Sequence, residues 1–341
     1  MTKHQFDFEA ITLGHGSGGE LTRELLDALI FKTFSNPILN QKHDGALIHL
    51  EGEIAVSTDS FVITPVFFKG GNIGSLSVHG TVNDVAMCGA IPKYLSLSFI
   101  IEEGLKIEEF ASIVASIKKA ADESAVQIIT GDTKVVERGK GDKIFINTTG
   151  FGTVHPEAAI SVHRIEVGDK ILVNGYIAQH GMAIMSEREG LEFESTIESD
   201  STNLNFLTEA LLSKFGDKIK LFRDPTRGGL GTVLHEISGD ISKGIFIKEN
   251  DIPLEKQVAA ACEMLGLDPM YVANEGVMIA IVDPTIADEA LALMKNHAKG
   301  TNAAIIGEVT EKHPNKVVME SPIGGKRIVS PLIGEQLPRI C

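Results

Sequence analysis

The sequence predicts a mixed α/β protein with two domains of similar size. Segments rich in β-branched residues alternate with amphipathic segments, which is the pattern of strands and helices that follow one another. The 341 residues are enough for two medium domains, each with its own core. A connection at 155–164, HPEAAISVHR, separates the two halves. We therefore expect domains at 1–155 and 156–330, followed by a flexible tail at 331–341.

Amphipathic segments predict the helices. The clearest pattern begins at Ile107, where Ile107, Phe110, Val114 and Ile117 recur at three- and four-residue intervals and form one apolar face. The other segments lie between β-branched runs in the same way. In chain order, helices are expected at 19–31, 73–88, 107–122, 178–189, 204–215, 228–238, 254–265 and 286–298.

The β-branched runs between these segments predict the strands. In chain order, strands are expected at 54–58, 94–101, 126–130, 143–149, 170–174, 276–282 and 303–309. The last eleven residues follow the final strand-like run and contain two prolines and a glycine, so we expect an unstructured tail. Fully extended at about 3.3 Å per residue, such a tail would reach roughly 35 Å.

The charge balance limits the classes of partner. The chain has 31 Lys and Arg against 46 Asp and Glu, a net charge of −15. Nucleic acids and anionic membranes require a cationic face, so neither is expected as a main partner. The N-terminus has no signal-peptide pattern, and no apolar run reaches the ~20 residues of a membrane span. We therefore expect a soluble, cytoplasmic protein.

Glycine is over-represented and clustered. The chain has 34 glycines, above the typical ~7% of residues. The run GHGSGG at 14–19 matches the dinucleotide fingerprint G-x-G-x-x-G before an expected helix. A second strand with an acidic end does not follow about twenty residues later, so the run fits a flexible loop as well as dinucleotide binding. A phosphate cradle of another design also stays open, because small residues ahead of a helix present free N–H groups.

Five aspartates could serve a hard cation. The P-loop sequence GxxxxGK[ST] does not occur, so ATP use would rest on other groups. Mg²⁺ takes a few carboxylate oxygens together with water and phosphates, which suits aspartates that converge from separate loops. For each aspartate alone a cap or turn is the simpler explanation, except at Asp84, whose small, apolar context would make an uncompensated carboxylate costly. The candidates are Asp44, Asp59, Asp84, Asp132 and Asp224.

Two more charged residues and two histidines are candidates. Lys134 lies beside Asp132 at a strand end, where α/β sheets gather ligands, although most lysines lie at the surface. Glu275 begins an apolar strand in NEGVMIAIV, and could equally be a turn residue. His15 and His79 could be ligands, but lone histidines are more often structural. No cluster has the spacing of a zinc site.

The three cysteines are too few and too scattered for a disulfide framework. Cys88 and Cys262 lie in apolar sequences, where a thiol is usually a small core residue. Cys341 is the last residue, and its own α-carboxylate disfavours the thiolate. It would be a mediocre resting nucleophile but a suitable carrier of a small acyl-type group, because an anchored tail can visit two sites. Chance placement is the alternative.

As a set, these residues resemble the HypE family of hydrogenase maturation proteins. The blocks that carry the resemblance occur in order over essentially the whole chain: GHGSGG, TDSFVITPVFFKGGNIGSLSVHGTVNDVAMCGAIP, GDTKVV, DPTRGGLGTVLHEI, NEG and the terminal PRIC. This family is similar to aminoimidazole ribonucleotide synthetase and selenophosphate synthetase, which bind ATP and lack the PRIC tail. The resemblance implies their two-domain α/β fold and a homodimer built through the N-terminal domains, whose sheets combine around the ATP sites.

The resemblance also implies a reaction. The carbamoyltransferase HypF would load a carbamoyl group onto Cys341, and ATP would phosphorylate the carbonyl oxygen of the thiocarbamate. Loss of phosphate and of the amide protons would leave a thiocyanate. Its cyano group would pass to iron held by a HypC–HypD complex and become a cyanide ligand of a [NiFe] hydrogenase.

Site roles follow from the resemblance. Cys341 would carry the group, Lys134 would stabilise the phosphoryl group or the substrate oxygen, and Glu275 would be the general base. Mg²⁺ would be held by Asp44, Asp59, Asp84 and Asp224. ATP would be bound by the glycine loop and two further segments, through His15, Gly16, Ser17, Gly18, Asn83, Asp84, Asp132 and Thr133.

Three other functions remain open at this point. A small-molecule kinase or synthetase of the same superfamily would make Cys341 incidental. A nucleotide-sensing scaffold for hydrogenase assembly would bind ATP without turnover. An NAD-dependent oxidoreductase would rest only on the short glycine match. The mass of Cys341 after incubation with its proposed substrates distinguishes them.

Overall fold

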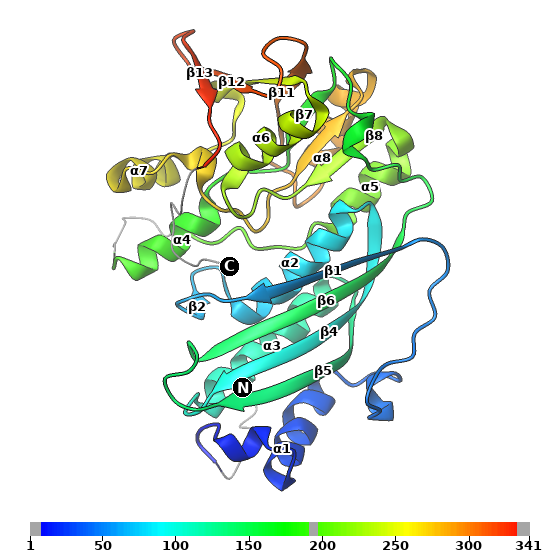
Figure 1. The fold of residues 1–341 in the computed structure, drawn as a ribbon, viewed down its shortest axis with the longest axis vertical. Coiled ribbons are helices and arrows are strands. Elements are labelled where there is room, and N and C mark those ends of the chain that lie inside the picture. The colour runs from blue at the N-terminus through cyan, green and yellow to red at the C-terminus, as the bar shows by residue number, and fades with distance from the viewer. Residues whose placement is uncertain (1–7, 191–196, 333–341) are drawn as a thin grey trace.

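A computed structural model describes residues 8–190 and 197–332, and it contains two large sheets, each packed against helices (Figure 1). The first sheet is formed by residues 54–154 and the second by residues 170–329. The mixed α/β class and the two-domain organisation predicted from the sequence are confirmed.

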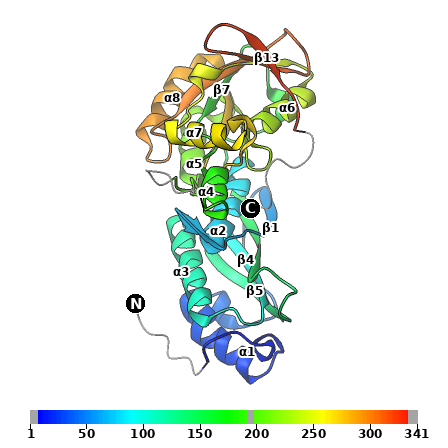
Figure 2. The same cartoon turned by 90° about the vertical axis from the view of Figure 1, so that its left-hand side faces the viewer.

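The first sheet has four strands in the order β1-β6-β4-β5. Neighbouring strands are antiparallel except β4 and β5, which run parallel on either side of a helical connection. Two helices cover one face of this sheet, as Figure 2 shows from the side. The elements are β1 (Ile54–Phe61), α2 (Ile73–Met87), β4 (Ala90–Glu102), α3 (Ile107–Glu123), β5 (Gln127–Val136) and β6 (Ile144–Val154).

Helix α2 lies between the first sheet and the second domain. Its start is fixed by Asn72, whose side-chain oxygen accepts the N–H groups of Gly74 and Ser75 at 2.8 and 3.3 Å. The helix is buried on almost all sides, because its small and apolar residues allow close packing in every direction. Ala86 and Met87 belong to the core of the second domain. Helix α2 therefore fixes how residues of the two domains meet.

The N-terminal segment lies along the β5 edge of the first sheet (Figure 1). The helix predicted over 19–31 is present, but its second half winds as a π-helix. A short strand pair, β2 (Phe67–Phe68) and β3 (Gly71–Asn72), precedes α2. The N-terminal elements are η1 (Leu13–Gly16), α1 (Glu20–Leu25), η2 (Leu26–Phe31) and η3 (Leu39–Gln41).

The second sheet has seven strands in the order β13-β12-β9-β11-β7-β10-β8, with apolar cores on both faces. All neighbouring strands are antiparallel except β9 and β12. Its strands are β7 (Lys170–Val173), β8 (Ile219–Arg223), β9 (Gly244–Lys248), β10 (Ile279–Val282), β11 (Ala304–Thr310), β12 (Val317–Glu320) and β13 (Lys326–Val329). Its helices are α4 (Gln179–Arg188), α5 (Asn205–Phe215), α6 (Gly229–Ile241), α7 (Lys256–Leu265) and α8 (Ala287–Asn296), with short turns η4 (Val162–Arg164), η5 (Gly216–Lys218), η6 (Glu249–Asp251), η7 (Pro269–Tyr271) and η8 (Pro284–Ile286).

Several sequence predictions need correction. The strands β8, β9, β12 and β13 were not predicted, because they are only four or five residues long and each contains at least one charged residue. The strand expected over 276–282 begins only at Ile279. Cys88 is exposed rather than a core residue, because it lies at the very end of α2. Cys262 is buried, as predicted.

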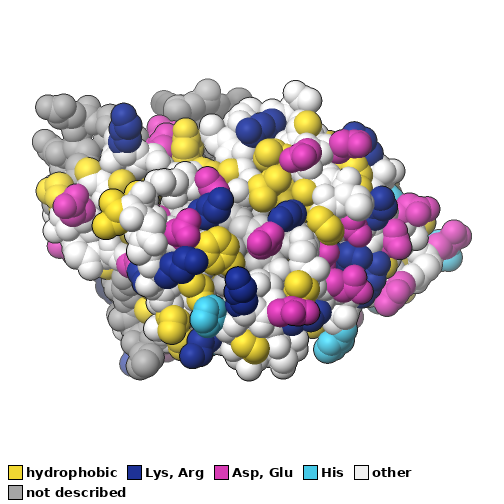
Figure 3. Space-filling view, turned by 90° about the horizontal axis from the view of Figure 1, so that it is seen from above, with side chains coloured by type: hydrophobic (Ala, Val, Ile, Leu, Met, Phe, Trp, Pro, Cys, Tyr) yellow, Lys and Arg dark blue, Asp and Glu magenta, His cyan; other side chains and the backbone are white. Residues whose placement is uncertain are grey.

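The surface of the second domain carries mixed charge. Figure 3 shows Lys and Arg side chains interspersed with Asp and Glu over the face seen from above. Within residues 8–190 and 197–332, none of the helices is both long and apolar enough to span a membrane. Most of the predicted tail, 333–341 with Cys341, lies outside the described residues.

Candidate functional site

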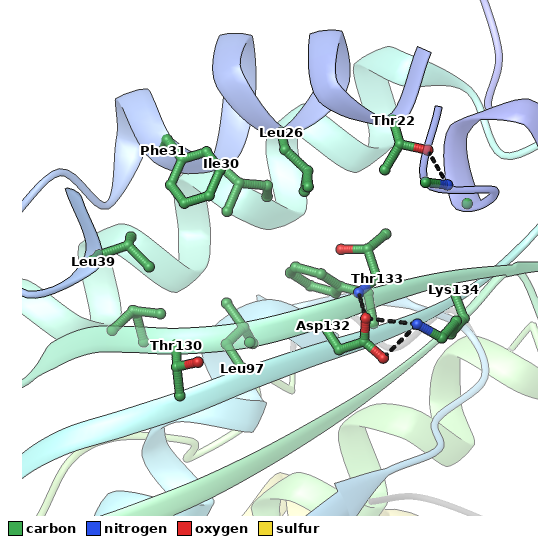
Figure 4. Close-up of a pocket in the computed structure, with 15 residues that line it drawn as sticks. Thr22, Leu26, Ile30, Phe31, Leu39, Leu97, Thr130, Asp132, Thr133 and Lys134 are labelled. Atoms are coloured by element: carbon green, nitrogen blue, oxygen red, sulfur yellow. Dashed lines mark hydrogen bonds and ion pairs between the residues drawn. The ribbon is translucent and has the colours of Figure 1, made fainter. Parts of the chain in front are cut away.

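A cavity of about 210 Å³ lies between the N-terminal helices and the β4–β5 part of the first sheet. Figure 4 shows the helical residues on one side and the strand residues on the other. One end is apolar, and the other is formed by the glycine loop and the strand segment 130–134. The apolar lining is Leu26, Ile30, Phe31, Leu39, Leu97, Phe99 and Ile128; the polar lining includes Gly16, Gly18, Thr22, Thr130, Asp132, Thr133 and Lys134.

The glycine loop is pressed against β5. A Cβ atom built at Gly16 would lie 2.5 Å from the Val135 nitrogen, so only glycine fits there. Thr22 of α1 closes the loop, because its hydroxyl donates to the Gly14 carbonyl at 3.2 Å and accepts the Gly18 N–H at 3.0 Å. The loop geometry is therefore set by contacts with β5 and α1.

Two predicted ATP-binding side chains face the loop itself. His15 is buried, with its Nδ1 atom 3.0 Å from the Thr12 nitrogen and its ring packed at a tilt against Phe8. The Ser17 hydroxyl donates to the Gly14 carbonyl at 3.0 Å. In the described structure these two side chains hold the loop, and the main chain at Gly16 and Gly18 lines the cavity.

Asp132 and Lys134 form an ion pair at the polar end of the cavity (Figure 4). The distance from Lys134 Nζ to the Asp132 carboxylate is 2.8 Å, and the carboxylate also accepts the Thr133 N–H at 2.8 Å. The hydrogen bond from Lys134 lowers the pKa of Asp132. Both side chains are mostly exposed, so this positive charge is available to a phosphate in the cavity.

A second group of acidic residues lies between the domains. Asp84 of α2 and Asp224, which follows β8, are hydrogen bonded to each other, and the Ser57 hydroxyl donates to Asp84 at 2.7 Å. Burial, followed by the negative charge of Asp224, raises the pKa of Asp84 to about 7. Burial also raises the pKa of Asp224 and of Asp59 on β1. The negative charge of Asp224 therefore disfavours the ionised form of Asp84, and a cation bound to both carboxylates would remove this repulsion.

This pair fits a magnesium ion. Mg²⁺ is typically bound by one or two carboxylates, with phosphate and water oxygens as the other ligands. Among the described residues there is no group of three or more His, Cys, Asp or Glu arranged around one metal position. Asp44 lies in an exposed loop before β1, apart from the pair. The four-aspartate cage expected from the resemblance is thus not preformed: Asp84 and Asp224 are in contact, Asp59 is near, and Asp44 is separate.

Glu275 lies in the loop between η7 and β10, buried against α2. A Cβ atom built at Gly80 of α2 would be 3.9 Å from its Oε2 atom, so the carboxylate lies one helical turn from Asp84. Burial, followed by the charges of Asp200 and Asp224, raises the pKa of Glu275 well above its usual value. A carboxylate with a raised pKa is a stronger base once it is ionised.

The side chain of Asn83 is hydrogen bonded to the second domain. It is buried, its Nδ2 donates to the carbonyls of Thr202 and Glu275 at 2.9 and 3.4 Å, and its Oδ1 accepts the Leu204 N–H at 2.8 Å. These hydrogen bonds hold the second domain against α2. A role of Asn83 in orienting phosphates stays a prediction.

The two groups of residues lie at opposite edges of the first sheet. Lys134 is on β5 and Asp59 is on β1, with β6 and β4 between them. Three strand spacings of about 4.8 Å separate these edges by roughly 14 Å. Neither Asp84, Asp224 nor Glu275 lines the cavity beside Lys134. Sequence reasoning did not identify the apolar cavity lining, Ser57 or Asp200, since all are ordinary residues until the fold brings them to the site.

Two family models match the chain. The model "AIR synthase related protein, N-terminal domain" covers residues 42–154, and "AIR synthase related protein, C-terminal domain" covers 166–320. The protein "Carbamoyl dehydratase HypE" of Bradyrhizobium diazoefficiens is 48% identical over 332 residues, which are 97% of this chain and 96% of that protein.

Solved structures are similar over nearly the same length. A structure of hydrogenase maturation protein HypE in complex with ATP is 47% identical, with a TM-score of 0.93, and the match covers 97% of this chain and 99% of that one. A HypE–HypF complex contains a chain that is 44% identical, with a TM-score of 0.80, matched over 92% of this chain and 100% of that one.

Proposed function

Because the chain belongs to the HypE family of carbamoyl dehydratases, which act in hydrogenase maturation, we propose that it converts an S-carbamoyl group on Cys341 into a thiocyanate with ATP. The product would donate its cyano group to iron. The observation that carries this proposal is the buried carboxylate of Glu275, held one turn of α2 from the Asp84–Asp224 pair.

The chemistry requires activation of a poor leaving group. The carbamoyl oxygen attacks the γ-phosphorus of ATP, and ADP leaves. Removal of two protons from the amide nitrogen then expels inorganic phosphate and forms the carbon–nitrogen triple bond. In sum, the S-carbamoyl cysteine and ATP give the thiocyanate, ADP and phosphate. The protein must therefore neutralise phosphoryl charge and accept protons in a site that excludes water.

The cavity at the β5 edge supports a nucleotide site. Its apolar end, between Leu26, Phe31 and Phe99, suits a flat base, and the main chain of the glycine loop at Gly16 suits phosphate oxygens. Lys134 adds a positive charge at the polar end of the cavity, which the glycine loop also lines. Mg²⁺ held by Asp84 and Asp224 would supply charge neutralisation to the phosphates.

Lys134 and Glu275 have complementary proposed roles. The ammonium group of Lys134 would stabilise the phosphoryl group or the substrate oxygen, and the ion pair with Asp132 orients it. The carboxylate of Glu275 would accept a proton from the amide nitrogen. Its burial supports this role, because a desolvated carboxylate is more basic than an exposed one.

A homodimer would bring the two halves of the site together. Within one chain, Lys134 lies on the β5 edge of the first sheet and Asp59 lies on the opposite β1 edge. The face of this sheet opposite α2 exposes the large side chains of Ile54, Val56 and Ile100, which are 45%, 55% and 45% accessible. We infer that a second copy covers this face and places its glycine loop and Lys134 against the first copy's acidic residues.

Two partners complete the proposed sequence of reactions. HypF would supply the carbamoyl group, in line with the similarity to the HypE chain of a HypE–HypF complex. A HypC–HypD complex would receive the cyano group. Both steps need Cys341 to move between a partner and the dehydration site.

Mass spectrometry of the C-terminal peptide tests this function. After incubation with HypF, carbamoyl phosphate and ATP, the peptide is expected to gain a carbamoyl group and then lose one water. Cys341→Ala should abolish both changes, and Cys88→Ala, which alters the exposed cysteine of α2, should leave both intact. A Cys341→Ala protein that still supports cyanide ligand formation would reject the carrier role.

A further inference from the structure

The loop that carries Glu275 is held by a carboxylate from another segment. Asp200 precedes α5 and accepts the backbone N–H groups of both Glu275 and Gly276. We propose that Asp200 is a positioning residue for dehydration, which fixes the Glu275 backbone so that its carboxylate stays aimed at the substrate. This inference rests on the proposed role of Glu275.

The contacts are specific to this loop. The N–H of Glu275 is 3.2 and 3.3 Å from the two Asp200 oxygens, and the N–H of Gly276 is 2.9 Å from Oδ2. No helix or strand includes residues 275 and 276, so these hydrogen bonds substitute for a regular backbone ladder. From the other side, Asn83 of α2 donates to the Glu275 carbonyl at 3.4 Å. The peptide groups on both sides of Glu275 are thereby anchored.

Asp200 is itself held by its neighbours. The Ser199 hydroxyl is 2.8 Å from Nδ1 of His180 on α4, and the Ser201 hydroxyl is 3.1 Å from Nδ1 of His79 on α2. Both histidines are buried. The two serines therefore fasten the segment on either side of Asp200 to helices of both domains.

The backbones of the two segments are in direct contact. A Cβ atom at Gly276 would overlap the Asp200 carbonyl oxygen, so a side chain at this position would separate them. This explains the glycine of the NEG sequence as a packing requirement. It also means that the position of Asp200 is transmitted to Glu275 without an intervening side chain.

The negative charge of Asp200 raises the pKa of Glu275, as burial does. After desolvation, Asp200 is the largest contribution that raises the pKa of Glu275. Burial raises the pKa of Asp200 to about 6, while the N–H groups of Gly276 and Glu275 oppose this shift. At neutral pH Asp200 is therefore mostly ionised and able to accept these hydrogen bonds.

Single-turnover dehydration of the carbamoylated C-terminal peptide, followed by mass spectrometry, tests the inference in the full-length protein with HypF, carbamoyl phosphate and ATP. Asp200→Ala should slow dehydration about a hundredfold, as expected for a catalytic group displaced by an ångström, and leave carbamoylation and ATP binding unchanged. Asp200→Asn keeps one acceptor oxygen and should stay within about tenfold of the natural protein. Asp283→Ala removes an acceptor of the Thr285 N–H in the same domain and should have no effect.

A double variant separates positioning from general destabilisation. If Asp200 acts through Glu275, then Asp200→Ala combined with Glu275→Gln should be no slower than Glu275→Gln alone. Additive losses would overturn the inference, as would an Asp200→Asn protein as slow as Asp200→Ala. If Glu275→Gln dehydrates at the normal rate, the base assignment itself fails. If Glu275→Gln is slow and Asp200→Ala is normal, only the inference about Asp200 fails.

Discussion

The glycine loop offers a sharp test of nucleotide binding in the N-terminal cavity, through the substitution Gly16→Ala. The added Cβ would lie 2.5 Å from the Val135 nitrogen and 2.8 and 2.9 Å from two Val135 side-chain carbons. Ordinary contacts begin at 3.4 Å, so the loop must move away from β5 by about 0.9 Å. Because Val135 N is part of a strand, the loop moves and the strand does not.

The expected loss of ATP affinity follows from this displacement. Forced overpacking costs about 1–3 kcal/mol. If the loop must return to its place to bind phosphate, that cost reduces ATP affinity about five- to hundredfold at ~1.4 kcal/mol per tenfold. Isothermal titration calorimetry with ATP and Mg²⁺ measures it, and thermal unfolding reports whether the fold is intact.

Gly19→Ala is the matched control. It lies in the same loop with φ of −86°, and its added Cβ would meet only the Ser17 hydroxyl at 3.7 Å. Its ATP affinity should therefore match that of the natural protein. Equal affinities for all three proteins would refute the placement of phosphates at this loop.

Three further predictions concern the metal pair, the dimer and a buried histidine. Asp84→Asn should abolish Mg²⁺-dependent ATP hydrolysis in a phosphate-release assay, because it removes one carboxylate of the Asp84–Asp224 pair; unchanged hydrolysis would remove Asp84 from the metal site. Val56→Glu on the exposed sheet face should give monomers in light scattering, whereas Val167→Glu, exposed in the second domain, should not; a Val56→Glu dimer would reject this interface. Burial lowers the pKa of His79 to about 4 from 6.5, so the unfolded chain binds a proton that the folded chain does not, and stability falls as the pH drops from 6.5 toward 4. Over this pH range, the free energy of unfolding of His79→Gln, measured with urea, should fall by up to about 3 kcal/mol less than that of the natural protein. An identical pH dependence of the two proteins would contradict this prediction.

Long elements with one periodic pattern could be predicted from the sequence. The helix from Ile107 has a continuous apolar face and is present as α3, and the apolar strand before Asp132 is present as β5. The short strand β8 contains Lys220 and Arg223, and β13 begins with Lys326 and Arg327. Both become strands because neighbouring strands offer hydrogen bonds. Their formation depends on tertiary contacts that no local window contains.

The candidate site also contains some residues that could be predicted from the sequence and others that could not. Asp84 could be singled out because a carboxylate in a small, apolar helix is costly without a compensating cation. The structure places Asp84 against Asp224, and the cation stays a prediction. Asn83, its neighbour, could not be placed, because its hydrogen bonds go to Thr202 and Leu204 more than a hundred residues away. No sequence pattern identified Asp200 as a site residue, because its proposed role depends on a contact with Gly276 that exists only in the folded chain.

The fate of the carbamoyl oxygen tests the central claim most directly. Cys341 is carbamoylated with an ¹⁸O-labelled carbonyl group and dehydrated with ATP, and the inorganic phosphate is then analysed by mass spectrometry. If ATP activates the carbonyl oxygen, one ¹⁸O atom appears in the phosphate for each thiocyanate formed. Thiocyanate formation with unlabelled phosphate, and the ¹⁸O in water, would contradict the account.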